Sequence, residues 1–169
     1  LDFVTDVTKY RLTQKLDDVS ATFSGSLFEL PAGPVKIALN AEYRSSSLDL
    51  VSNAQPLDQA NCTNLPLCLP ASEYQFNVVA NAKGKQNVTE GAVELNVPLL
   101  KDKPFFQTLS ISGAARYTHY NTSGSVTTWK LGGDWEPVDG LRFRATRSRD
   151  IRAPNVTELF APTSTSPTG

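Results

Sequence analysis

The sequence is poor in the residues that most metal sites require. It has no methionine, two cysteines and a single histidine among 169 residues. This scarcity argues against a zinc site, whose usual ligands are paired cysteines and histidines, so no metal is expected. An excess of charge is also missing, because 16 basic and 17 acidic side chains leave a net charge of -1. Nucleic-acid-binding proteins usually carry a basic excess, so no nucleic acid is expected as a partner.

Long apolar segments are missing too. No run of apolar residues approaches the length of a helical membrane span, and the first residues, "LDFVTDVTKY", do not form a secretory signal. The chain begins with leucine and stops in "TSTSPTG", so we interpret it as a piece of a longer protein. There is no Ser-His-Asp order, no carboxylate pair in a catalytic context and no glycine-rich phosphate loop. We therefore expect neither enzyme activity nor a cofactor.

What the sequence does contain is strict alternation of apolar and polar residues. Apolar side chains occupy odd positions in 19–27, 35–43, 93–97, 109–117, 129–135 and 141–145. This period of two places one apolar and one polar face on each strand. It predicts an all-β protein whose antiparallel strands pair in chain order as a meander. The expected strands are 17–29, 34–45, 86–98, 107–120, 125–136 and 140–150, with residues 1–15 a weaker candidate for another.

Alternation alone does not say which face lies outside. A soluble sandwich buries its apolar face, whereas an outer-membrane barrel turns that face toward lipid and keeps a polar lumen. The apolar faces carry no charge, and strands of about ten residues suit a tilted bilayer crossing. Both features favour a partial segment of a transmembrane β-barrel. The apolar face is expected to include Val35, Ile37, Leu39, Leu95, Leu109, Ile111, Leu131 and Phe143. The lumen-facing candidates are Lys36, Glu42, Arg44, Glu90, Glu94, Arg116, Lys130, Asp134, Arg142 and Arg144.

Aromatic residues and connections give further support to the barrel. Aromatic side chains gather near strand ends, where an interfacial belt would lie, although plain core packing is the alternative. They are Tyr43, Phe105, Phe106, Tyr117, Trp129 and Trp135. The links "LPAGP" and "EPVDG" are tight turns, whereas residues 46–85 form one long polar connection. Short turns on one rim and long loops on the other predict that 46–85 is an extracellular loop.

The two cysteines lie inside that predicted loop. Cys62 and Cys68 stand in the polar stretch "NCTNLPLC". They can be two free thiols or a local disulfide, and the bond is favoured if the loop faces an oxidising compartment. We therefore predict a disulfide between them. It closes a short ring, so its stabilisation should be modest, about 2–3 kcal/mol at most.

The stretch "RATRSRDIRAPNVTELFAP" concentrates arginine and then becomes apolar around a proline. Together with "LPAGPVKIALNAEYR", "VTEGAVELNVPLL" and "GAARYTHYNTSGSVTTWKLGGDWEPVDGLRF", it resembles the barrel of TonB-dependent outer-membrane receptors. In that family a strand rich in Arg and Ser leads into an R-A-P-x-x-x-E-L-F element. The matching residues here are Arg152, Ala153, Pro154, Glu158, Leu159 and Phe160. The resemblance covers most of the chain from about residue 20 to residue 160.

The resemblance implies a function. It implies a receptor in the outer membrane of a Gram-negative bacterium that takes up a scarce solute, such as a ferric siderophore, cobalamin or a carbohydrate. The implied partners are outer-membrane lipid, the receptor's own plug domain and the TonB energy-transducing complex. The plug domain and the last barrel strands are expected to lie outside this segment. The alternative is a soluble or surface β-domain that binds carbohydrate without transport.

The arginines themselves allow two interpretations. Arg142 and Arg144 share the polar parity, so they are expected to face the lumen. Arg147, Arg149 and Arg152 follow where the strand leaves the lipid and an outward charge becomes tolerable. The lumen arginines can form a salt-bridge network that holds the wall, or they can attract an anionic substrate. Pro154 is expected to end the strand and begin a loop.

Overall fold

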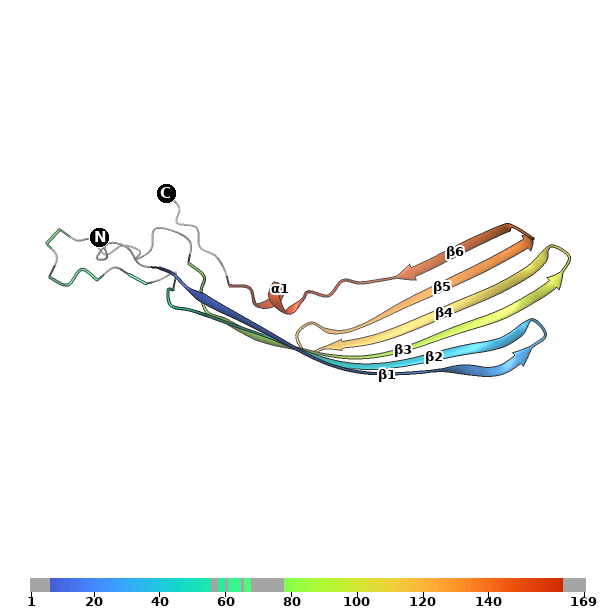
Figure 1. Ribbon diagram of the computed structural model, residues 1–169, viewed down its shortest axis with the longest axis horizontal. Helices are drawn as coiled ribbons and strands as arrows, with labels where there is room; N and C mark the ends of the chain where they lie inside the picture. Colours follow the sequence, from blue (N-terminus) through green and yellow to red (C-terminus); the bar gives the residue numbers. More distant parts are fainter. Residues whose placement is uncertain (1–6, 56–57, 60, 65, 68–77, 163–169) are drawn as a thin grey trace. The chain divides into compact units, whose positions relative to one another are not determined.

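The structure is a computed structural model that describes residues 7–55, 58–59, 61–64, 66–67 and 78–162. These residues form one six-stranded sheet and one short helix. The elements are β1 (Tyr10–Leu30), β2 (Gly33–Ser52), β3 (Ala82–Lys103), β4 (Phe106–Tyr120), β5 (Gly124–Val138), β6 (Leu141–Arg149) and α1 (Val156–Phe160). The strands pair in chain order, so β1 and β6 form the two edges (Figure 1). The predicted all-β antiparallel meander is confirmed.

The hydrogen-bonded registers keep odd and even residues on opposite faces of the sheet. Leu95 of β3 lies opposite Gly113 of β4, which in turn lies opposite Leu131 of β5. Pairing within one parity continues from β5 to β6, where Trp135 lies opposite Phe143. Along the pairings from β3 to β6, irregularities occur between Pro98 and Leu100 and between Trp135 and Val138, close to the short turns. The predicted separation of faces is therefore confirmed from β3 to β6.

The odd-numbered face carries large apolar side chains that nothing in the described chain covers. Phe23 is 72% exposed and Leu131 is 59% exposed, and Ile111 and Phe143 are exposed as well. A face of this kind is expensive in water, at roughly 25 cal/mol for each Å² of apolar surface that stays uncovered. Val35 is the exception, because it is buried. The described residues contain no second sheet against which a sandwich could bury this face.

Aromatic rings meet where β4 and β5 approach their short turns. The indole Nε1 of Trp135 donates a hydrogen bond to the carbonyl oxygen of Phe105 at 3.0 Å. The ring of Trp135 also lies 5.8 Å from that of Phe106 and 5.5 Å from that of Phe143, measured between centroids. At the other end of β4, the Tyr117 hydroxyl donates to Ser125 Oγ at 2.9 Å. The indole contact shows the apolar body and polar handle that suit an interfacial position.

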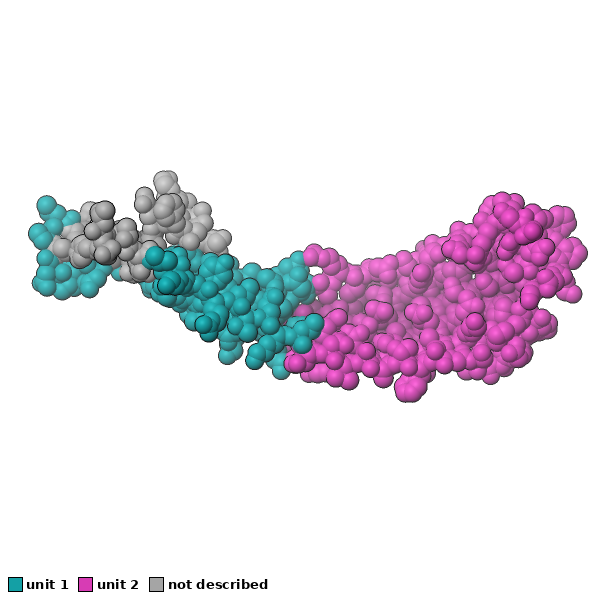
Figure 2. All heavy atoms as spheres, in the orientation of Figure 1, with its two compact units in different colours: residues 1–16, 46–85, 154–169 teal, residues 17–45, 86–153 magenta. Residues whose placement is uncertain are grey.

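The chain divides into two compact units, which are described separately (Figure 2). Unit 2 comprises residues 17–45 and 86–153 and holds most of the sheet. Unit 1 comprises residues 1–16, 46–85 and 154–169, and its described part holds the N-terminal end of β1, the C-terminal end of β2, the start of β3, and α1.

The first three strands are longer than predicted. They span 20 to 22 residues each, so 46–52 and 82–85 are strand rather than loop, and residues 10–15 belong to β1 rather than to a further strand. The reason lies in the phase of the alternation. Leu48 is 2% exposed and Leu50 is also buried, so in unit 1 the buried apolar side chains of β2 occupy even positions, while Val51 at an odd position is exposed. A search for apolar residues at odd positions therefore misses the C-terminal end of β2, where the buried apolar residues are even-numbered.

A single charge on either face of β2 tests which face meets lipid. Replacing Ile37 with arginine in the complete receptor should lower the free energy of unfolding by about 2–4 kcal/mol if the residue lies near the bilayer midplane. The matched control is Ala38→Arg, one position away on the even face, which should cost much less. The measurement is equilibrium unfolding in lipid vesicles, and equal costs for the two variants would contradict lipid exposure of the odd face.

Candidate functional site

The even-numbered face of unit 2 is the candidate functional site, because it gathers the predicted lumen-facing residues. The β3–β6 registers place six of them on one face, with Asp134 directly opposite Arg144. These six are Glu90, Glu94, Arg116, Lys130, Asp134 and Arg144. Arg142 joins them through its contact with Asp134. In β2, Lys36 lines a hollow with Glu94, and Glu42 pairs with Arg44 at 3.3 Å.

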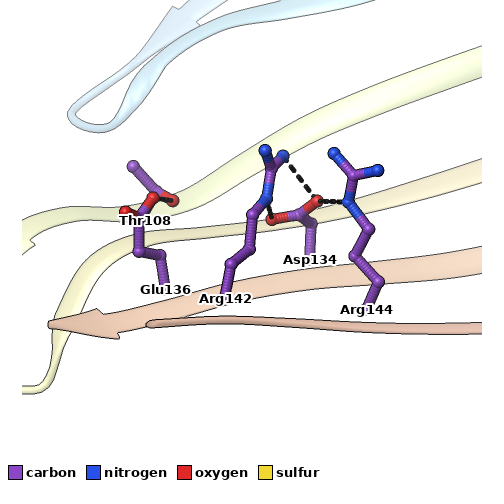
Figure 3. Close-up of polar contacts among 5 residues, drawn as sticks. All are labelled: Thr108, Asp134, Glu136, Arg142 and Arg144. Atoms are coloured by element: carbon purple, nitrogen blue, oxygen red, sulfur yellow. Dashed lines mark hydrogen bonds and ion pairs between the residues drawn. The ribbon is translucent and has the colours of Figure 1, made fainter. Parts of the chain in front are cut away.

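The most connected group is Asp134 with two arginines of β6. Arg142 donates from Nε and Nη2 to the two carboxylate oxygens of Asp134, both at 2.6 Å. Arg144 donates from Nε to Oδ2 at 2.9 Å, so the two guanidinium groups flank one carboxylate (Figure 3). A two-pronged guanidinium–carboxylate contact fixes geometry as well as charge. The group ties β6 to β5, and its own net charge is positive.

A second polar group ties β4 to β3. Glu90 accepts a hydrogen bond from the buried Thr118 hydroxyl at 3.0 Å and pairs with Arg116 at 3.1 Å. The side chain of Glu90 is only 10% exposed. A charge in such a position needs partners because burial removes water, and both carboxylate oxygens have one here. The group therefore stabilises the pairing of β3 with β4.

A hollow lies on the same face beside the Glu90–Arg116 group. It is lined by Glu90, Glu94, Arg116, Lys130, Asp150 and Ile151, among others. Asp150 and Ile151 belong to the segment that follows β6, so this segment borders the polar face of the sheet. Within the described parts of the chain, Lys36, Glu94 and Lys130 form no ion pair. These three charged groups are available to a ligand or to a further segment of protein.

The prediction that Pro154 ends the strand and begins a loop is wrong, because β6 ends at Arg149 and the R-A-P-x-x-x-E-L-F motif contains the whole of helix α1. Asn155 is the N-cap of α1, and its side chain accepts from the Glu158 backbone N–H at 2.8 Å. The Glu158 carboxylate accepts in return from the Asn155 N–H at 3.0 Å. This is a capping box, so the glutamate of the motif has a structural role. The Asn-x-x-Glu spacing was visible in the sequence and could have predicted the helix.

Within unit 1, the side chains of Thr157 and Phe160 hold the helix against β1 and β3. Gln14 of β1 donates from Nε2 to Thr157 Oγ1 at 2.8 Å. The ring of Phe160 lies directly on the backbone of Gly84 in β3, so closely that a Cβ there would overlap the ring. The phenylalanine of the motif thus requires a glycine in a distant strand. No sequence pattern signals this contact.

Other predicted features of the site remain predictions. Cys62 lies among the described residues but Cys68 lies outside them, so the disulfide between them stays a prediction. The described residues contain no cluster of His, Cys, Asp and Glu side chains that could hold a metal ion. No helix in the described part of the chain is both long and apolar enough to cross a membrane.

The open antiparallel meander, with an exposed apolar face and an opposite polar face, is consistent with one part of a β-barrel wall. A family model described as "TonB dependent receptor-like, beta-barrel" matches residues 2–169. The chain therefore belongs to the family of TonB-dependent receptor β-barrels. This family consists of transport receptors of the Gram-negative outer membrane. Neither the curated proteins nor the solved structures contain a match to the chain.

The contact between α1 and β3 can be tested by adding one methyl group. Gly84→Ala should destabilise the complete receptor by about 1–3 kcal/mol, because the new Cβ overlaps the Phe160 ring. Gly91→Ala in the same strand is the matched control, since nothing lies within 4 Å of a Cβ built there. A double-mutant cycle with Phe160→Ala should remove most of the Gly84 effect. Strictly additive unfolding free energies would contradict the contact.

Proposed function

We propose that this chain forms part of the wall of an outer-membrane receptor that takes up a scarce solute by an energy-coupled route. One observation carries the proposal, namely the exposed apolar side chains on the odd positions of unit 2, such as Phe23, Ile111, Leu131 and Phe143. Lipid is the environment in which such a face is stable, because hydrocarbon does not penalise it. Water would favour its association with other surfaces, so a soluble carbohydrate-binding domain does not explain it.

The partners of the chain follow from the same proposal. The open edges at β1 and β6 carry unpaired backbone groups, and hydrocarbon requires them to pair with further strands of a closed barrel. The even face, with its available Lys36, Glu94 and Lys130, would line the lumen and meet the plug domain. Energy would reach the receptor through the TonB complex. A ferric siderophore, cobalamin or a carbohydrate is the proposed class of solute.

The arginines of β6 have a wall-holding role in this proposal. Arg142 and Arg144 share the carboxylate of Asp134, whose side chain is 21% exposed, so their charges are already engaged. Their position ties β6 to the rest of the sheet. The long connection between β2 and β3 would lie on the extracellular side, and the turns beside Ala32 and Asp139 on the periplasmic side.

Uptake by intact cells tests the function. A strain that lacks the receptor should lose uptake of one radiolabelled solute among ferric siderophores, cobalamin and oligosaccharides, and the complete receptor should restore it. Uptake should stop when the TonB complex is inactivated, because the family couples transport to that complex. The receptor should also fractionate with the outer membrane. Recovery in the soluble fraction, or uptake that persists without TonB, would contradict the proposal.

The same assay separates the two roles of the arginines. Replacing Arg142 and Arg144 together with glutamine should lower the receptor's free energy of unfolding. The apparent KM for solute uptake should stay unchanged. The matched control replaces Arg147 and Arg149, which lie on the odd face opposite Leu131 and Trp129. A raised KM that loses its dependence on ionic strength would instead assign these arginines to attraction of an anionic substrate.

A further inference from the structure

Three hollows adjoin one another on the even-numbered face of unit 2. The hollow beside the Glu90–Arg116 group shares Lys130 with a second hollow. It shares Glu94 with a third. All the residues that border the three hollows belong to unit 2. We name the three hollows together the recess.

Small side chains in register form the floor of the recess. Glu94 of β3 lies opposite Ala114 of β4, which lies opposite Lys130 of β5. Neighbouring strands are about 4.8 Å apart, so about 10 Å separates the backbones that carry Glu94 and Lys130. In the next row of this face, Ser112 lies opposite Gly132, where a Cβ would come within 2.7 Å of the serine oxygen. The recess therefore owes its depth to the small size of these residues.

Two charged side chains flank this floor without a partner of opposite charge. Glu94 and Lys130 are exposed, and they form no ion pair with each other or with another described residue. Because a carboxylate only accepts hydrogen bonds and an ammonium group only donates them, a ligand that bridges the two must do both. A hydroxyl group meets this requirement. Hydroxyl groups of the protein also border the recess, at Ser24, Ser26 and Thr146.

The charges that border the recess almost cancel. Five of these side chains are basic and four are acidic, which leaves a net charge of +1. A surface with nearly balanced charges gives an anion or a cation little long-range attraction, so the recess suits a ligand without net charge. The nine residues are Lys36, Arg116, Lys130, Arg142 and Arg144, and Glu90, Glu94, Asp134 and Asp150.

We propose that the recess binds a neutral oligosaccharide, with Glu94 accepting hydrogen bonds from its hydroxyl groups and Lys130 donating to them. The inference rests on the proposed function, because it selects carbohydrate among the three classes of solute. A zwitterion such as a short peptide would satisfy the two charged groups and leave the hydroxyl groups of the recess without partners. An oligosaccharide presents hydroxyl groups along its whole length, so it matches both kinds of group.

Uptake of a defined panel of solutes tests the class. Cells that contain the complete receptor would be given radiolabelled neutral oligomers of glucose, xylose, mannose and galactose. The panel also includes a catecholate and a hydroxamate ferric siderophore, cobalamin and a zwitterionic tripeptide. We expect TonB-dependent uptake of a neutral oligosaccharide. TonB-dependent uptake of another member of the panel in its place would overturn the inference and leave the proposed function intact, whereas uptake of none would contradict the proposed function itself.

Two single substitutions test the recess as the binding site. Glu94→Ala and Lys130→Ala should each raise the apparent KM for that oligosaccharide about tenfold, because each removes a hydrogen bond to a charged group. The maximal rate per receptor should not change. Neither side chain has an ion-pair partner among the described residues, so neither substitution leaves an opposite charge unpaired.

Lys101→Ala and Glu136→Ala are the matched controls. They remove the same kinds of charge from β3 and β5, but these residues do not border the recess. Their apparent KM should equal that of the unaltered receptor, and an equal rise in controls and recess variants would overturn the inference. So would an unchanged KM in the recess variants. If that unchanged KM came with a lowered free energy of unfolding, the recess would be assigned to contact with the plug domain.

Discussion

The separation of an apolar and a polar face depends on one constraint. Odd residues pair with odd residues, and even with even, along most of the pairings from β3 to β6. The registers from β3 to β6 pair Leu95 with Gly113 and Gly113 with Leu131, so an apolar residue on one strand continues the apolar face of the next. A shift of one residue would exchange the two faces of a strand and place charges such as Asp134 among apolar side chains. The irregular pairings lie beside the short turns, where they leave the faces intact along most of each strand.

The constraint also explains how the polar face is organised. Asp134 lies opposite Arg144, and Glu90 lies two residues from Ala92, the register partner of Arg116, so ion pairs form between neighbouring strands on one face. The same face is bordered by Asp150 and Ile151, which come after the last strand. In unit 1, α1 contacts the even positions Gln14 of β1 and Gly84 of β3.

Local patterns made the sheet predictable, whereas contacts distant in sequence were not. Residues such as Ile37 and Leu109 reveal a strand through their immediate neighbours, because alternation is a local property. Leu48 and Leu50 also alternate with polar residues, but they stand at even positions instead of odd ones. For this reason the sequence predicted a loop where the structure has a strand. The Asn155–Glu158 capping box is also a local pattern. The proline directly before it indicates a strand end and a loop, and it therefore draws attention away from the helix. The residues near Gly84 in the sequence do not predict its contact with the Phe160 ring, because the two residues meet only in the folded chain.

A spin-label scan along β2 tests most directly whether the odd face of unit 2 meets lipid. Single labels would be placed at each position from 37 to 51 of the complete receptor in lipid bilayers. We predict that the odd positions 37–43 are accessible to oxygen dissolved in lipid, and that Ser47 and Asp49 are accessible to an aqueous nickel complex. Leu48 and Leu50 should be shielded from both reagents. Odd positions from 37 to 43 that are shielded from oxygen, or that react with the aqueous complex, would contradict the account.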